Sequence, residues 1–459
     1  MKQKIINRRN ILNTIFYLGY VILLFFVFTR HENWFDEAQS FLLAKLPINE
    51  LFTALKSEGH PITWYLILKG YILLGFKYEY VGIISVIFSS ISALIILKKS
   101  KLNIFVNYII LLCPMCLFYS GVIARSYSLI LLLMTILTFI YKDREKHYLS
   151  YGIILFLLLN THIIMLGFVA SICLIDLYNA LFKTKYMSKD LFISYLIVLI
   201  GLFFLLIQLT GSLDSNILVT NNKFSFNLLY LTLRSIGYGC FYYTNLVNIG
   251  LIMFGVLIIY LIHKKEDELL FIYLFSFMFL IIIFSLLWQY SAHMTPGILS
   301  ILIFILINMY HKLNTKKEKI VLSIIIILLF SPMTITSYKL VKRDITSEFS
   351  GSKMAAKYVR SYIKEDNNLY CYTAVDCLSI IPYLPNYNFY KLGTHEKIEY
   401  VNWNDKNLYN YNFDIENLNK YKVNYIIEDD IRTQIDSRVI YRNKKTYIKE
   451  NYIVRKVIR

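Results

Sequence analysis

ILNTIFYLGYVILLFFVFT, residues 11–29, is an uncharged run long enough to cross a bilayer, because a membrane-spanning helix needs about 20 apolar residues. Similar apolar blocks follow at 61–76, 79–97, 103–119, 124–141, 149–160, 163–181, 190–210, 246–263, 269–289, 295–311 and 319–337. Of the 459 residues, 57% are hydrophobic and 17% are charged, whereas a soluble protein carries roughly a quarter charged residues. The sequence therefore predicts a polytopic α-helical membrane protein and argues against a soluble enzyme or a disordered chain.

The net charge of +18 has a pattern that orients these blocks. Much of the excess lies in short loop clusters at 2–9, 98–101, 142–146, 183–189, 264–265 and 312–319. Because Lys and Arg resist translocation, such clusters mark cytoplasmic loops rather than a nucleic-acid surface. If the N-terminus is cytoplasmic, all of these basic clusters are cytoplasmic only when the block 61–76 is shallow or broken and does not make a full crossing. We therefore expect about 11–13 helices with eleven net crossings, and outer loops at 30–60, 120–123, 211–245 and 290–294.

An odd number of crossings places the C-terminus outside the cell. We expect a transmembrane domain over 1–344 and a small soluble extracytoplasmic α/β domain over 345–459. Within the latter, the spacing of apolar residues predicts a helix over Gly351–Lys364. Strand-like runs follow at Leu369–Thr373, Phe389–Leu392, Val423–Ile427 and Tyr447–Val454. Cys371 and Cys377 could pair if this domain faces an oxidising compartment.

The first outer loop, 30–60, and the residues directly after it collect the polar chemistry. They hold neighbouring carboxylates, an imidazole and aromatic rings, in the order Trp34, Asp36, Glu37, Glu58, His60, Trp64 and Tyr65. Such groups at a membrane interface can supply a general base, a ligand and a surface that stacks on a sugar or lipid. The alternative is a solvated loop with an aromatic belt.

Other ionisable residues reach the same predicted face. The outer boundary holds His31, His60, His162 and His293. Arg125 also lies there, at the start of a helix, where a cation opposes the helix dipole. Its guanidinium is suited to binding an anion such as a phosphate, although it could instead snorkel to lipid phosphates. Ionisable groups that converge on one face of a membrane bundle indicate a functional site.

Three motifs carry a family resemblance: WFDEA at 34–38, EGHPITWY at 58–65 and ARSY at 124–127. In this order they resemble the GT-C glycosyltransferases, in particular the protein O-mannosyltransferase (family 39) type and its bacterial relatives, including the lipid A aminoarabinose transferases. QYSAHMTPG at 289–297 and FSGSKMAAKYVRSYIKE at 349–365 are similar to later segments of these enzymes. The chain departs from the family pattern at Ile62, where a second proline is usual, and at Ala292, where an arginine is usual.

The resemblance implies inverting transfer of a sugar from a polyprenyl-phosphate donor at the outer face of the cell membrane. Asp36 would be the catalytic base, and Glu37 would position the acceptor or a divalent metal ion, with His60 nearby. Arg125 would bind the donor phosphate, with Arg234 as a substitute for the missing arginine. Glu58 and His293 are further acceptor or metal candidates, and Trp34, Trp64 and Tyr65 are candidate sugar or lipid contacts. The acceptor would be a protein, a wall polymer or a lipid.

Two other functions fit the sequence. A transporter or flippase of lipid-linked sugars would use the outer polar cluster as a gate, and a non-catalytic scaffold for envelope assembly would act through its soluble domain. The absence of paired Gly- or Pro-broken helices in the two halves of the sequence disfavours the transporter.

Overall fold

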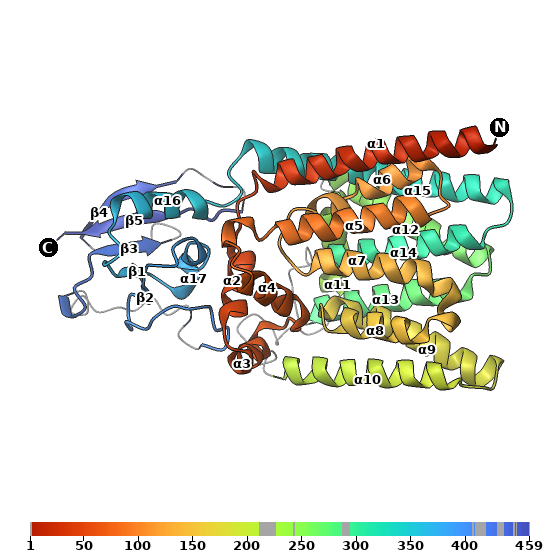
Figure 1. The fold of residues 1–459 in the computed structure, drawn as a ribbon, viewed down its shortest axis with the longest axis horizontal. Coiled ribbons are helices and arrows are strands. Elements are labelled where there is room, and N and C mark those ends of the chain that lie inside the picture. The colour runs from red at the N-terminus through yellow and green to blue at the C-terminus, as the bar shows by residue number, and fades with distance from the viewer. Residues whose placement is uncertain are drawn as a thin grey trace.

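The computed structural model describes residues 2–210, 226–241, 244–286, 294–405, 408, 419–428, 436–443, 446 and 448–458. The molecule is elongated, with a helical bundle at one end and a small sheet domain at the other (Figure 1). The N-terminus lies at the far end of the bundle, and the C-terminus lies at the far end of the sheet domain.

The bundle consists of apolar helices of different lengths. They are α1 (Lys2–Phe28), α5 (Ile83–Lys99), α6 (Ile104–Leu111), α7 (Tyr127–Ile140), α8 (Tyr148–Leu159), α9 (Leu166–Tyr178), α10 (Lys189–Leu209), α11 (Phe226–Phe241), α12 (Thr244–His263), α13 (Asp267–Leu286), α14 (Thr295–Lys312) and α15 (Lys316–Thr346). Among the described residues, seven helical segments are long and apolar enough to cross a membrane. The predicted polytopic α-helical membrane fold is thus confirmed.

Burial in the bundle shows which helices lie at its centre. In α14 every side chain from Thr295 to Tyr310 is buried, so this helix forms the middle of the bundle. The helix α1 instead exposes a row of apolar side chains that includes Ile11, Ile15 and Ile22. A helix at the lipid boundary keeps such residues outward because hydrocarbon, not water, surrounds them.

Three short helices lie between the bundle and the sheet domain (Figure 1). These juxtamembrane helices are α2 (Phe35–Lys45), α3 (Ile48–Glu58) and α4 (Thr63–Leu73), and each has 11 residues. Eleven helical residues rise about 16 Å, roughly half the thickness of the hydrocarbon core. The apolar block 61–76 therefore does not cross the bilayer as one helix, as the charge pattern predicts.

The predicted outer loop 211–245 needs a correction. Its second half is the helix α11, which packs against α12, α13 and α15. The prediction was wrong here because polar and small residues such as Thr232, Arg234 and Gly237 interrupt the apolar run and lower its hydropathy.

The C-terminal domain is built on a five-stranded sheet in the order β2-β1-β3-β5-β4. The strands are β1 (Leu369–Cys371), β2 (Phe389–Lys391), β3 (Tyr425–Glu428), β4 (Ser437–Arg442) and β5 (Ile453–Val457). The pairs that β1 makes are parallel, and those that β5 makes are antiparallel. The predicted helix is present as α16 (Ser352–Tyr362), and the small α/β domain is confirmed.

Two strand predictions need correction. The run Tyr447–Val454 overlaps β5 only at its end, because the strand begins at Ile453. The prediction missed β4 altogether. This edge strand carries Ser437, Arg438 and Arg442 and has no buried side chain, so it lacks the apolar alternation that indicates a strand.

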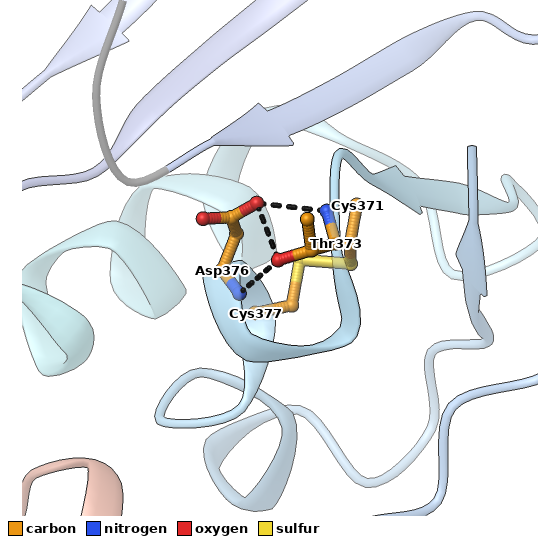
Figure 2. Close-up of a disulfide and its surroundings, with 4 residues drawn as sticks. All are labelled: Cys371, Thr373, Asp376 and Cys377. Carbon is orange, nitrogen blue, oxygen red and sulfur yellow. Dashed lines mark hydrogen bonds between the residues drawn. A yellow bond between two sulfur atoms is a disulfide. The ribbon is translucent and has the colours of Figure 1, made fainter. Parts of the chain in front are cut away.

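Cys371 and Cys377 form a disulfide at the end of β1 (Figure 2). Between them, the Thr373 N–H and hydroxyl donate to the Asp376 carboxylate at 2.7 and 2.8 Å. These bonds cap the short helix α17 (Ala374–Cys377), which packs on β1, β2 and β3. The disulfide and the cap together hold this turn against the sheet.

Candidate active site

The first turn of α2 presents the two neighbouring carboxylates. Asp36 and Glu37 are its acidic residues, and carboxylates are stabilised at a helix N-terminus by the unpaired N–H groups and the helix dipole. The Glu37 side chain turns back, and its Oε2 accepts from the Trp34 N–H at 3.0 Å. Successive side chains on a helix point about 100° apart, so the two carboxylates face different surroundings.

Glu37 is wholly internal, with a side chain that is 0% exposed. Its Oε1 accepts from the Ala124 N–H at 2.6 Å, and its Oε2 lies 3.2 Å from Nε2 of His31. A buried carboxylate is stable only when such donors replace the water that it loses.

His31 lies between two carboxylates. Its Nδ1 is 3.1 Å from both oxygens of Asp344 on α15, while its Nε2 faces Glu37. Burial alone would lower the pKa of His31, but the charges of Asp344 and Glu37 raise this pKa to about 10. His31 is therefore an imidazolium at neutral pH. We call His31, Glu37, Asp344 and the Ala124 N–H the Glu37 clamp, which connects α2 to the start of α7 and to α15.

Asp36 remains accessible and pairs with Arg125. Its Oδ2 lies 3.4 Å from the Arg125 Nη1, and its side chain is 21% exposed. The same Nη1 donates to the Asp36 carbonyl oxygen at 3.1 Å. The structure thus brings together the residues that the sequence proposes as catalytic base and phosphate ligand.

The other terminal nitrogen of Arg125 reaches a histidine pair. Nη2 lies 3.1 Å from Nε2 of His60. Because arginine can only donate, Nε2 of His60 accepts, and His60 is neutral with its proton on Nδ1. The rings of His60 and His162 are 4.8 Å apart, and His162 stacks on Tyr127 at 5.7 Å. Two of the four predicted outer histidines therefore lie together beside Arg125.

The His60–Pro61 segment is held by contacts that the sequence did not indicate. Gly59, with φ of 69°, ends α3 in a left-handed turn that glycine adopts readily. The Ile62 N–H then donates to Gln208 on α10 at 2.7 Å, and the Thr63 N–H donates to the Asn160 carbonyl at 3.0 Å. Gln208 and Asn160 lie at or near the ends of apolar blocks in the sequence. This position gives no indication that they belong to a functional site.

The sheet domain covers the site through Gln39, one turn after Asp36. The Gln39 amide donates to the Val401 carbonyl at 2.7 Å and accepts from the Val401 N–H at 3.0 Å. Phe35 adds a ring contact with Trp403 at 5.8 Å. The segment that carries Val401 and Trp403 therefore forms part of the site's wall, and no pattern in the sequence predicted this.

Glu58 lies under this cover and is buried. Burial raises its pKa to about 8, although hydrogen bonding from Gln39 and the charge of Arg125 act in the opposite direction. Glu58 is therefore mainly protonated and neutral at pH 7, beside the Asp36–Arg125 pair.

The remaining candidates lie elsewhere or inside the core. Trp64 and Tyr65 are buried in hydrophobic clusters, and Trp34 packs edge-on against Phe349. Arg234 is exposed on α11, where its Nη2 donates to the Tyr238 hydroxyl at 2.9 Å. His293 lies outside the described residues. The roles predicted for these residues stay predictions.

Comparison with known proteins finds a solved structure with a similar fold. No family model matches the chain, and no curated protein matches it. Among solved structures, the crystal structure of ArnT from Cupriavidus metallidurans bound to undecaprenyl phosphate matches with a TM-score of 0.59 and 10% identity, over 96% of this chain and 97% of that one. The chain has the ArnT fold. At the level of the fold, this confirms the predicted resemblance to GT-C glycosyltransferases, and the ArnT fold accounts for nearly the whole chain.

The divalent metal ion stays a prediction. In the part of the chain that the structure describes, no group of three or more His, Cys, Asp or Glu side chains could hold a metal ion. Both oxygens of Glu37 already accept hydrogen bonds, and Nε2 of His60 accepts from Arg125. The predicted ligand pair, Glu37 and His60, thus has these ligand atoms engaged in hydrogen bonds.

The Glu37 clamp predicts a defined pH dependence of stability. His31 has a pKa of about 10 in the folded protein and 6.5 when unfolded, so the folded state holds the proton between these values. Stability is therefore greatest below pH 6.5 and falls as the pH rises toward 10. His31→Gln should lower stability by about 3–5 kcal/mol and remove this slope, because it leaves both carboxylates without their cation.

The measurement is the thermal midpoint of purified protein between pH 6 and 10. His147→Gln, at an exposed histidine of a loop, is the matched control and should retain the wild-type slope. A wild-type midpoint that does not change over this range would contradict the ion-pair assignment.

Proposed function

We propose that this protein is a membrane glycosyltransferase that moves a sugar from a polyprenyl-phosphate donor to an acceptor, with inversion at the anomeric carbon. Asp36 is the general base, and Arg125 binds the donor phosphate. The observation that carries the proposal is the division of labour in the first turn of α2. Glu37 has both oxygens occupied, whereas Asp36 is accessible beside a cation.

The reaction is a single displacement. Asp36 accepts the proton of the acceptor hydroxyl or amine while that oxygen or nitrogen bonds to the anomeric carbon. The bond from this carbon to the phosphate oxygen breaks, and polyprenyl phosphate leaves with the electron pair. Arg125 offsets the charge that develops on the phosphate, and His60 holds the guanidinium in place from its other side.

A single displacement needs one accessible carboxylate, and the site offers Asp36. A double displacement would require a second carboxylate near the anomeric carbon to form a covalent intermediate. Glu37, the nearest in sequence, is committed to the clamp, and Glu58 is buried and mainly protonated. The arrangement therefore favours inversion.

We place the site and the sheet domain on the extracytoplasmic side. The basic loop clusters favour this orientation, and the Cys371–Cys377 disulfide supports it, because disulfides persist in oxidising compartments. The ArnT neighbour, whose structure contains undecaprenyl phosphate, supports a polyprenyl-phosphate donor. The acceptor would approach the accessible side of Asp36, and it would be a protein, a wall polymer or a lipid.

The direct test uses reconstituted protein and a panel of radiolabelled polyprenyl-phosphate sugars. Water is a poor acceptor, so the cognate donor should hydrolyse slowly even without the true acceptor. Asp36→Asn should reduce this turnover by about 10²–10⁴-fold, because it removes the base and leaves the site's shape unchanged. Asp366→Asn, at an exposed aspartate of the sheet domain, is the control and should retain activity.

Two results would contradict the proposal. Equal turnover by wild type and Asp36→Asn would exclude Asp36 as the base. No turnover with any donor, together with equal movement of labelled lipid across the bilayer by both proteins, would instead favour the flippase.

The raised pKa of Glu58 predicts how donor binding depends on pH. As the pH rises through about 8, Glu58 ionises and its new charge competes with the donor phosphate for Arg125. The donor KM should therefore rise above this pH in the wild type. Glu58→Gln, which mimics the neutral acid, should bind donor as well as wild type at pH 7 and show no such rise. An identical KM–pH profile in the two proteins would contradict this role for Glu58.

A further inference from the structure

A cavity lies at the junction of the bundle and the sheet domain, with a volume of about 540 Å³. The C-terminal half of α2, the turn after α4 and the sheet-domain segment 382–387 line it. Lys45, which lines the cavity, is nine residues after Asp36 on α2, or about 13 Å along the helix. The lining contains none of Asp36, Glu37, His60 and Arg125, but Phe41 lies one helical turn after Glu37, so the cavity is next to the candidate active site.

Aromatic rings form one wall of this junction cavity. Tyr78 contacts Phe41 at 4.9 Å and Tyr383 at 4.8 Å, and all three residues line the cavity. These rings give the cavity an apolar side next to its charged groups.

Three cations line the junction cavity: Lys45, Lys77 and Arg360. Within the described chain, none of the three forms an ion pair, although Glu79 and Glu365 line the same cavity. All three side chains are exposed, and the Arg360 Nη2 also donates to the Tyr383 carbonyl at 2.6 Å. Three cations at the rim of one cavity favour an anionic ligand.

The cavity lies at the edge of the membrane. A membrane-spanning segment, Tyr78–Lys99, begins at its wall. The turn just before this segment exposes Leu73, Leu74 and Phe76, whose exposed fractions are 79%, 75% and 55%. Gly75 and Phe76 of this turn also line the cavity. Cations and exposed apolar side chains thus occur together at one place, as recognition of an amphiphile requires.

We propose that the junction cavity binds the phosphate headgroup of an anionic lipid in the leaflet next to the sheet domain. Lys45, Lys77 and Arg360 donate charge-assisted hydrogen bonds to the phosphate. The acyl chains lie along Leu73, Leu74 and Phe76. Such a lipid would link the sheet domain to the juxtamembrane helices through its headgroup. This inference does not depend on the proposed transferase activity.

The test measures lipid binding by full-length protein with native mass spectrometry in detergent. Phosphatidylglycerol and phosphatidylcholine are the probes, because they differ in headgroup charge. Wild type should bind phosphatidylglycerol in preference to phosphatidylcholine. K45Q/K77Q/R360Q should bind phosphatidylglycerol at least about tenfold more weakly, since each cation near a membrane surface adds to the attraction for an anionic headgroup. K56Q/K357Q/K364Q removes three exposed lysines outside the cavity and should bind as wild type does.

A second variant and a competition complete the test. Lys77→Gln removes one exposed cation of the cavity and should weaken phosphatidylglycerol binding even if the triple variant fails to fold. Equal binding by wild type, the triple variant and Lys77→Gln would overturn the proposal. Displacement of the lipid by millimolar inorganic phosphate would overturn the lipid assignment and indicate a site for the free anion, whereas retention of the lipid supports the headgroup site.

Discussion

The buried carboxylate of Glu37 is the constraint on which the candidate site depends. A charge with no access to water must be matched by fixed donors, and here they come from two separate parts of the chain, residues 31–34 and Ala124. The Trp34 N–H fixes the start of α2, the Ala124 N–H fixes the approach to α7, and His31 connects the carboxylate to Asp344 on α15. The residue next to Ala124 is Arg125. The bonds that satisfy Glu37 therefore also set the position of the guanidinium beside Asp36.

This arrangement explains how neighbouring acids can have different roles. Glu37 holds the elements together, and Asp36 remains available for chemistry. Arg125 is held by Asp36 on one side and by His60 on the other, so its orientation is fixed in advance of the phosphate binding that we propose. Groups oriented in advance need little reorganisation in the transition state, which is the usual source of electrostatic catalysis. The sheet domain adds to this order through Gln39 and Val401.

The sequence predicted the parts of the structure that depend on local pattern. Apolar block length and basic clusters indicated the bundle and the shallow segment 61–76, and the outer-loop motifs indicated Asp36, His60 and Arg125 as neighbours. Contacts that lie outside these motifs could not be predicted. Asp344 and Val401 carry no local signal, since their roles exist only once α15 and the sheet domain pack against α2. The helix α11 was also missed. Polar residues interrupt its apolar run, and its place in the bundle depends on contacts with α12, α13 and α15.

The most direct test of this account is a structure of the protein determined with undecaprenyl phosphate bound. The account predicts that the phosphate lies within hydrogen-bonding distance of the Arg125 guanidinium, on the accessible side of Asp36, with the Glu37 clamp unchanged. A phosphate bound away from Arg125, or a Glu37 carboxylate that has left the Ala124 N–H to contact the ligand, would contradict the division of roles between the two acids.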